Sequence, residues 1–317
     1  MRVGIQISAH EGVSWERWRR LARTVEELGF DSLWRADHFF SYSGDRRKES
    51  LETWVSLAVA AVETRRIRLG TLVCPVTFRH PALLARMAAQ VDLLSEGRLE
   101  LGLGAGHYAA EHQAFGIPFP ATPVRMEMLE ETCQVLRALW GPGPATFQGR
   151  HYRLQNAECY PKPAQRHLPI LIAGRGERRT LRIAAQYADH WNIIASSREE
   201  FVRKRAVLES HCGDVGRDPK QVRSSLETGV LTGRDLAELR GHVVRARAVN
   251  PGLSADPDVA ATELRQRGWL VGPPDQIVAG IRHLADSGVH EFIMQHKDSD
   301  NWRLLELVAT RVLPLVR

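Results

Sequence analysis

The chain has 317 residues, of which 44% are hydrophobic and 25% charged, a composition typical of globular proteins. The net charge of +6 is small, and no polybasic tail of the kind that binds nucleic acid is present in the sequence. This mild excess fits a locally basic pocket for an acidic ligand. No apolar run reaches the roughly 18 residues of a membrane helix, and the initial MRVGIQISAH lacks the apolar region of a signal peptide. We therefore expect a cytoplasmic protein with no membrane or nucleic-acid partner.

Cysteine and histidine spacing argues against a metal centre. The four cysteines, Cys74, Cys133, Cys159 and Cys212, lie far apart and form no CxxC pair. The histidines are scattered, and no HExxH motif occurs. We expect buried free thiols and no metal site.

Short β-rich segments alternate with helical segments along the chain. The first strand is expected at 2–7, followed by a helix over 14–30 with Ser14 as N-cap and Gly29 as its C-terminal stop. The first half continues with strands at 31–37, 67–74 and 98–106 and helices at 51–63, 81–97 and 122–140. The second half has strands at 169–174, 189–195, 221–231 and 290–296, and helices at 176–188, 198–211, 274–288 and 300–315.

About eight apolar strands in alternation with amphipathic helices predict a parallel sheet covered by helices. The length suits one α/β domain over residues 1–317, a (β/α)8 TIM barrel with insertions. The insertions are expected at about 141–168, with a hairpin around 145–154, and at about 233–268, carrying helix. A doubly wound open sheet is the alternative, although no GxGxxG motif follows the first strand.

Active sites of such barrels lie at the carboxyl ends of the strands. Asp37 and His38 follow the second strand, and the polar segments VCPVTFRHP, GAGHYAAEH and AGRGERRT follow the next three. In the last of these, Gly174 and Gly176 flank Arg175 ahead of a helix that should begin near Glu177. A glycine loop at a helix N-terminus offers free N–H groups to a phosphate. No GK[ST] follows, so it is not a Walker loop.

Four segments of the chain resemble the luciferase-like family of flavin and deazaflavin oxidoreductases, and more narrowly its coenzyme F420-dependent branch. They are ELGFDSLWRADHFF, RIRLGTLVCPVTFRHPALLARMAAQVDLLSEGRLELGLGAGHYAAEHQAFGIPFP, AGRGERRTLRIAAQYADHWN and VGPPDQIVAGIRHLADSGVHEFI. Together these segments cover most of the chain in the family's order.

The resemblance implies roles for the residues after the second and fourth strands. His38 would lie beside the deazaflavin ring and the substrate as general acid, general base or charge stabiliser. Asp37 would orient His38 or hydrogen-bond the ring, or it caps a loop. His107 would be a second acid or base, or only a wall of the pocket, and Glu111 is expected to be structural. Some sugar-phosphate-oxidising relatives carry Glu at the position of His107, so their substrate is not carried over.

The resemblance also implies a cofactor site. A bulge at the end of the third strand would carry a non-prolyl cis peptide at Leu72-Val73, with Cys74 as a packed thiol just beyond it. Small residues such as Gly104 would let a flat ring or another backbone approach closely. The expected cofactor contacts are Asp37, Thr71, Leu72, Val73, Gly104, Gly106, Ala173, Gly174, Arg175, Gly176, Glu177 and Thr180.

Three functions remain open from the sequence. The first is an F420-dependent oxidoreductase that transfers a hydride between the deazaflavin C5 and a small organic substrate. The second is an FMN-dependent monooxygenase of the same fold, which would need dioxygen and a reductase, and the third is a cofactor-binding relative without turnover. The resemblance implies a homodimer formed through helices beside the early strands.

Overall fold

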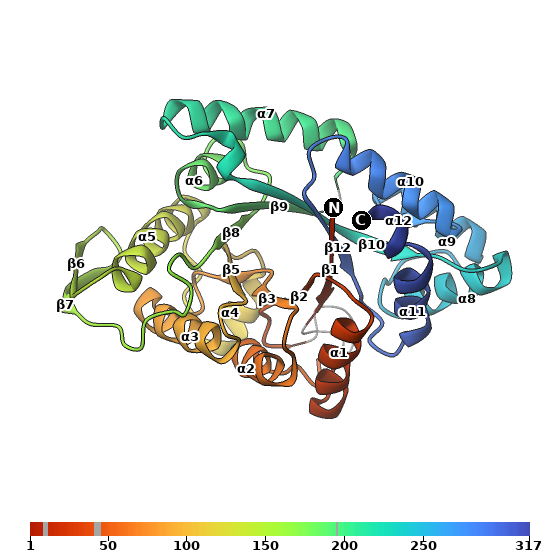
Figure 1. Ribbon diagram of the computed structural model, residues 1–317, viewed down its shortest axis with the longest axis horizontal. Coiled ribbons are helices and arrows are strands. Elements are labelled where there is room, and N and C mark those ends of the chain that lie inside the picture. The colour runs from red at the N-terminus through yellow and green to blue at the C-terminus, as the bar shows by residue number, and fades with distance from the viewer. Residues whose placement is uncertain (9–11, 41–45, 195) are drawn as a thin grey trace.

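The computed structural model of the protein describes residues 1–8, 12–40, 46–194 and 196–317, and its centre is a closed parallel barrel (Figure 1). The barrel strands pair in the order β10-β12-β1-β2-β3-β5-β8-β9, and β9 pairs with β10 to close the ring. These strands are β1 (Arg2–Ile7), β2 (Ser32–Arg35), β3 (Arg68–Thr71), β5 (Leu99–Gly104), β8 (Ile170–Ala173), β9 (His190–Ile194), β10 (Arg223–Leu231) and β12 (Glu291–Gln295). The predicted TIM barrel is therefore confirmed, and the open-sheet alternative is wrong.

Helices surround the barrel, each buried along the face that meets the strands (Figure 1). In α1, the Ser14 hydroxyl accepts the N–H of Arg17 at 3.3 Å, as the predicted N-cap requires, and Gly29 follows the helix with φ +86°. The ring consists of α1 (Trp15–Glu27), α2 (Thr53–Glu63), α3 (Pro81–Leu94), α5 (Thr122–Trp140), α6 (Thr180–Tyr187), α7 (Arg198–Asp214), α10 (Pro274–Ala285) and α11 (Trp302–Arg311).

The two segments expected as insertions, 141–168 and 233–268, contain a hairpin and two helices. Strands β6 (Ala145–Gln148) and β7 (Arg153–Ala157) form an antiparallel hairpin that projects from the barrel beside α5 (Figure 1). The second insertion carries α8 (Leu236–Arg247) and α9 (Pro257–Gln266), and β11 (Leu270–Val271) then pairs with the end of β10.

Several element boundaries differ from the sequence prediction. The expected strand 67–74 is two strands, β3 and β4 (Cys74–Pro75), and the short helix α4 (Ala109–Phe115) was not predicted. The closing helix is interrupted at Val312, where α12 (Leu313–Val316) begins, because Pro314 lacks the N–H that a continuous helix needs. A short 3-10 helix, η2 (Pro219–Gln221), precedes β10.

Helix α6 begins at Thr180 rather than near Glu177, so that expectation is wrong. The Glu177 carbonyl accepts the Nε2 N–H of His211 at 2.8 Å instead of joining a helical ladder. The Glu177 carboxylate is also held by Lys204 of α7 at 2.8 Å. These contacts keep residues 177–179 as a turn between the glycine loop and the helix.

Glu100 of β5 forms a charge network inside the amino-terminal end of the barrel. The carboxylate, 1% exposed, accepts hydrogen bonds from Arg68 at 2.6 Å and Arg223 at 2.9 Å. Burial alone would raise the pKa of Glu100, but the bond and charge of His190 and the two arginines hold it well below its ordinary value. This end of the barrel is therefore filled by paired charges.

The barrel interior above that network contains an apolar cluster. Trp34, Leu171 and Ile293 are buried there together, and Leu72 packs against them. Val73 and Ala173 are only partly buried on the same cluster, where the strands end. The interior is thus packed up to a floor that opens at the carboxyl ends of the strands.

Candidate functional site

A histidine–carboxylate pair stands at the carboxyl end of β2. The His38 Nδ1 atom lies 2.9 Å from Oε2 of Glu111, which is on α4 and 1% exposed. Oε1 of Glu111 accepts the N–H of Phe39 at 2.8 Å. Burial alone would raise the pKa of Glu111, but the hydrogen bond and charge of His38 and the N–H groups of Phe39 and Phe40 hold it below its ordinary value. Glu111 is therefore a carboxylate that fixes the imidazole, a more direct part in the site than the structural role expected from the sequence.

The second expected acid–base residue lies beside the first. His107 follows β5, after Gly106 turns the chain with φ +79°, and its side chain is exposed. Its ring centroid is 5.8 Å from that of His38, with the rings edge to face. The structure therefore brings together the two histidines predicted from separate strands.

Asp37 does not orient His38. Its carboxylate, 3% exposed, is bound by Arg79, at 2.5 Å to Oδ2 and 3.4 Å to Oδ1. Arg79 also lies 3.6 Å from the sulfur of Cys74, whose pKa is raised well above its ordinary value by burial, with the Asp37 charge adding to the effect. Asp37 therefore holds the loop between β4 and α3, and Cys74 is the packed thiol that was expected.

The bulge after β3 is present, with a cis peptide between Leu72 and Val73 as the resemblance implied. The Thr71 hydroxyl is engaged by the backbone of Gly102 in β5, donating to its carbonyl at 2.7 Å and accepting its N–H at 2.9 Å. A Cβ on Gly104 would lie 2.7 Å from Cγ2 of Val73. The small residues of β5 thus make room for the protein's own bulge. Of the two alternatives that the sequence left open, a flat ring or another backbone, the structure shows the second.

The loop after β8 presents a run of unused donors. In the part of the chain that the structure describes, no protein acceptor takes the N–H groups of residues 175–179. Gly174 has φ +135°, and a Cβ on Gly176 would lie 2.8 Å from the Thr180 hydroxyl, which packs over the loop. Consecutive free N–H groups in such a turn form an anion-binding concavity.

The side chains around this loop are mostly basic. Arg175 donates to the carbonyl of Ile194 at 2.7 Å and lies 3.4 Å from Glu200. Arg178 and Arg179 are exposed on the same turn, and Glu177 faces away from the donors into its pairs with α7. Ala173, at the strand end, is half-buried.

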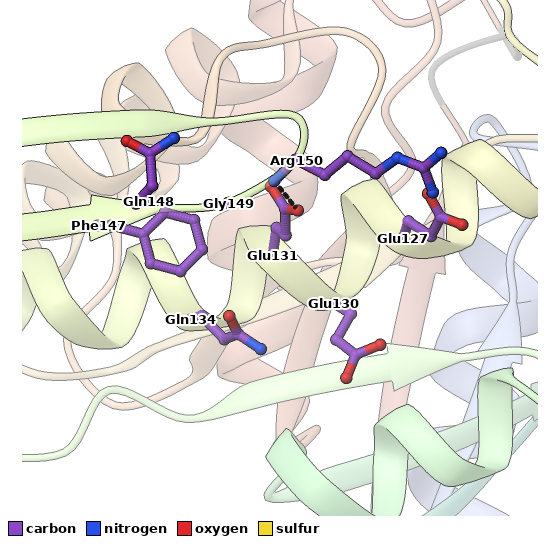
Figure 2. A pocket seen from close by; sticks show the side chains of 8 residues that line it. All are labelled: Glu127, Glu130, Glu131, Gln134, Phe147, Gln148, Gly149 and Arg150. Atoms are coloured by element: carbon purple, nitrogen blue, oxygen red, sulfur yellow. Dashed lines mark hydrogen bonds and ion pairs between the residues drawn. The ribbon is translucent and has the colours of Figure 1, made fainter.

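A cavity of about 250 Å³ lies elsewhere, between α5 and the β6–β7 hairpin (Figure 2). Oxygens of Glu131 accept the N–H groups of residues 150, 151 and 152, and Glu127 pairs with Arg150 and His151. The carboxylates of Glu127 and Glu131 therefore anchor the hairpin to α5. None of the expected site residues lines it, so we place the functional site at the barrel mouth.

Among the described residues, no group of three or more His, Cys, Asp or Glu is arranged to hold a metal ion. All four cysteines are buried and free. None of the described helices is both long enough and apolar enough to cross a membrane.

Comparison with known proteins defines the chain first as an oxidoreductase. The F420-dependent hydroxymycolic acid dehydrogenase of Mycobacterium tuberculosis is 28% identical over 327 aligned positions, covering 99% of this chain and 88% of the relative. The F420-dependent glucose-6-phosphate dehydrogenase of Kineococcus radiotolerans is also 28% identical, covering 100% of this chain and 97% of the relative.

Residues 1–291 match the luciferase-like monooxygenase family, and the chain belongs to that family. A solved structure with the same fold is an F420-dependent secondary alcohol dehydrogenase in complex with an F420-acetone adduct. It superposes with a TM-score of 0.84 at 22% identity and covers 100% of this chain and 99% of its own.

Proposed function

We propose that the protein is an F420-dependent oxidoreductase that transfers a hydride between C5 of the deazaflavin and a small organic substrate. The observation that carries the proposal is the pairing, at one barrel mouth, of a carboxylate-bound histidine with a loop of open N–H groups. Full-length relatives with F420 chemistry support the choice of cofactor over FMN. A screen of alcohols and ketones with oxidised and reduced F420 tests the reaction.

The residues present fit a phosphate-bearing cofactor. The N–H groups of residues 175–179 supply donors, and Arg175, Arg178 and Arg179 supply positive charge. Coenzyme F420 has a phosphodiester and an anionic tail that such a loop and rim would hold, and FMN would place its terminal phosphate there. The bound deazaflavin would supply or accept the hydride.

His38 would carry the proton that accompanies the hydride. Because Nδ1 is bonded to the Glu111 carboxylate, exchange with a substrate oxygen would run through Nε2. In the direction of alcohol oxidation, His38 would accept the hydroxyl proton, and the adjacent carboxylate would stabilise the resulting imidazolium. His107, 5.8 Å away between ring centroids, would complete the wall of the substrate site.

Replacing Arg175 with alanine should weaken F420 binding about tenfold and leave turnover at saturating cofactor nearly unchanged. A hydrogen bond to a charged group contributes about 1.5–3 kcal/mol, and Arg175 is half exposed, so the lower end applies. Fluorescence titration gives the dissociation constant. Arg198→Ala, at the start of α7, is the control. An unchanged dissociation constant in Arg175→Ala would reject the phosphate loop.

We also propose a homodimer that covers an apolar face on α2 and α3, which pack side by side (Figure 1). Val55, Val62, Leu83 and Leu94 are each about half exposed on these helices. The Val62→Glu/Leu94→Glu double substitution should convert the dimer to a monomer by light scattering. The Val202→Glu variant, on α7, should stay dimeric. A monomeric wild type would overturn this assignment.

The cytoplasmic location expected from the sequence remains a prediction.

A further inference from the structure

Glu227 is a buried carboxyl group that points into the barrel near its mouth. It lies on β10 in register with Ile293 of β12, which is part of the apolar interior, and with Ile194 of β9. Neighbouring residues in register on parallel strands share a face of the sheet. Ile194 is 45% exposed where β9 ends, so the layer that contains Glu227 is close to the opening.

The surroundings of Glu227 differ from those of the structural carboxylate Glu100. Glu227 is 5% exposed, and its partner among the described residues is neutral, the Gln295 amide at 2.7 Å from Oε1. Burial raises the pKa of Glu227 to about 7, and the Gln295 bond and the charge of Lys297 only partly oppose this. Glu100, in contrast, is enclosed by cations.

The described neighbours of Glu227 on β1, β9 and β12 are uncharged. Gln6 comes from β1, Gln295 from β12 and Ile194 from β9, while Asn192, one layer deeper, bonds to Ser225 at 2.9 Å. Lys297, just beyond β12, is the charge that acts on Glu227. Burying a carboxyl group among neutral amides reduces stability, and a carboxyl pKa shifted close to neutral is typical of a functional site.

A second polar atom beside it lacks a partner. Gln6 is 4% exposed, and its Oε1 atom has no hydrogen-bond partner among the residues that the structure describes. Gln6 pairs across strands with Gln295, the partner of Glu227. Buried acceptors are normally satisfied, so an unpaired one at a barrel mouth indicates a ligand that donates.

The floor of the mouth therefore has two halves. Leu72, Val73 and Ala173 make an apolar half on β8 and the bulge after β3. Gln6, Glu227 and Gln295 make a polar half on the adjacent strands β1, β10 and β12. A flat ligand that packs on the apolar half would present an edge to the polar half.

We propose that Gln6, Glu227 and Gln295 form an acceptor site on the floor of the mouth that binds an N–H or O–H donor of the organic ligand. The inference rests on the proposed function. The donor has two possible sources, the imide N–H of the deazaflavin's pyrimidine ring or a hydroxyl group of the substrate. The Glu227 carboxylate would accept this hydrogen bond.

The test is a fluorescence titration of wild type and Glu227→Gln with F420 between pH 6 and pH 8. A hydrogen-bond donor binds the ionised carboxylate better than the protonated one. As pH rises through 7, the affinity of wild type for F420 should therefore increase about fivefold more than the affinity of Glu227→Gln does. Any titration of F420 itself is common to both proteins and cancels in the comparison. Glu130→Gln, on α5, is the control and should match wild type.

The second arm uses the F420-loaded proteins with propan-2-ol and glucose 6-phosphate as hydroxyl probes. If the affinity for F420 depends on Glu227, the site binds the cofactor. If only the affinity for the hydroxyl probes depends on Glu227, the site binds the substrate. Gln6→Leu should weaken binding of the same ligand as Glu227→Gln does. Agreement between the two variants would show that the effect does not come from a folding defect in one of them. F420 binding with no Glu227 dependence in either arm overturns this inference alone. Failure of wild type to bind F420 overturns the proposed function as well.

Discussion

Replacing His38 with alanine is expected to lower kcat by roughly 10²–10⁴-fold while F420 still binds, because a positioned acid or base contributes about that much. The ring is held at 2.9 Å from a carboxylate that is 1% exposed, which is the arrangement that fixes a proton-transfer imidazole. Steady-state kinetics with saturating F420 measure the change. Wild-type turnover in this variant would remove His38 from the mechanism.

Glu111 supplies the control that separates chemistry from folding. If Glu111 acts through His38, Glu111→Gln should lower kcat in the wild-type background and have little further effect on His38→Ala. Two losses that simply multiply would show that Glu111 acts independently. His167→Ala, an exposed histidine near Asp189, should leave kcat unchanged.

Replacing Glu100 with glutamine should reduce the free energy of unfolding by about 3 kcal/mol. Removing one member of a buried ion pair costs about 3–5 kcal/mol, and Arg68 and Arg223 are about a quarter to a third exposed, which favours the lower end. Urea unfolding followed by circular dichroism measures the difference. Glu209, whose side chain is 47% exposed beside Arg205, offers the control, since Glu209→Gln should change stability by less than about 0.5 kcal/mol.

The same carboxylate predicts a pH dependence. The folded-state pKa of Glu100 is depressed, so its contribution is present above the unfolded-state pKa of about 4.5 and is lost as pH falls toward the folded value. Wild type should therefore lose stability below about pH 4.5 more steeply than Glu100→Gln. Parallel pH profiles for the two proteins would show that the network around Glu100 does not stabilise the fold through charge.

Much of the architecture could be predicted from local sequence patterns. Apolar strands alternating with amphipathic helices indicate a parallel barrel, and Ser14 and Gly29 correctly mark the two ends of α1. The placement of Asp37, His38 and His107 at strand ends also followed from this alternation. These features depend on periodicity and capping, which a single sequence contains.

The partners of the site residues could not be predicted in this way. Asp37 and His38 are adjacent in sequence, yet each binds a different distant residue, Arg79 and Glu111. The start of α6 depends on a carbonyl taken by His211 of α7. Such pairings depend on how elements pack rather than on spacing along the chain.

Glu227 is a site residue that the sequence did not predict. A lone acid in the strand QVRSSLETGVL has no motif, although strand alternation places it on the same face as Arg223 and Ser225. Its burial and its neutral neighbours from β1 and β12 become visible only once the barrel closes.

The central claim is the cofactor, and the most direct measurement is titration of the purified apo-protein with F420 and, separately, with FMN, followed by fluorescence quenching. We expect micromolar binding of F420 and much weaker binding of FMN. Tight binding of FMN with no binding of F420 would contradict it and would make the FMN-dependent monooxygenase the better assignment.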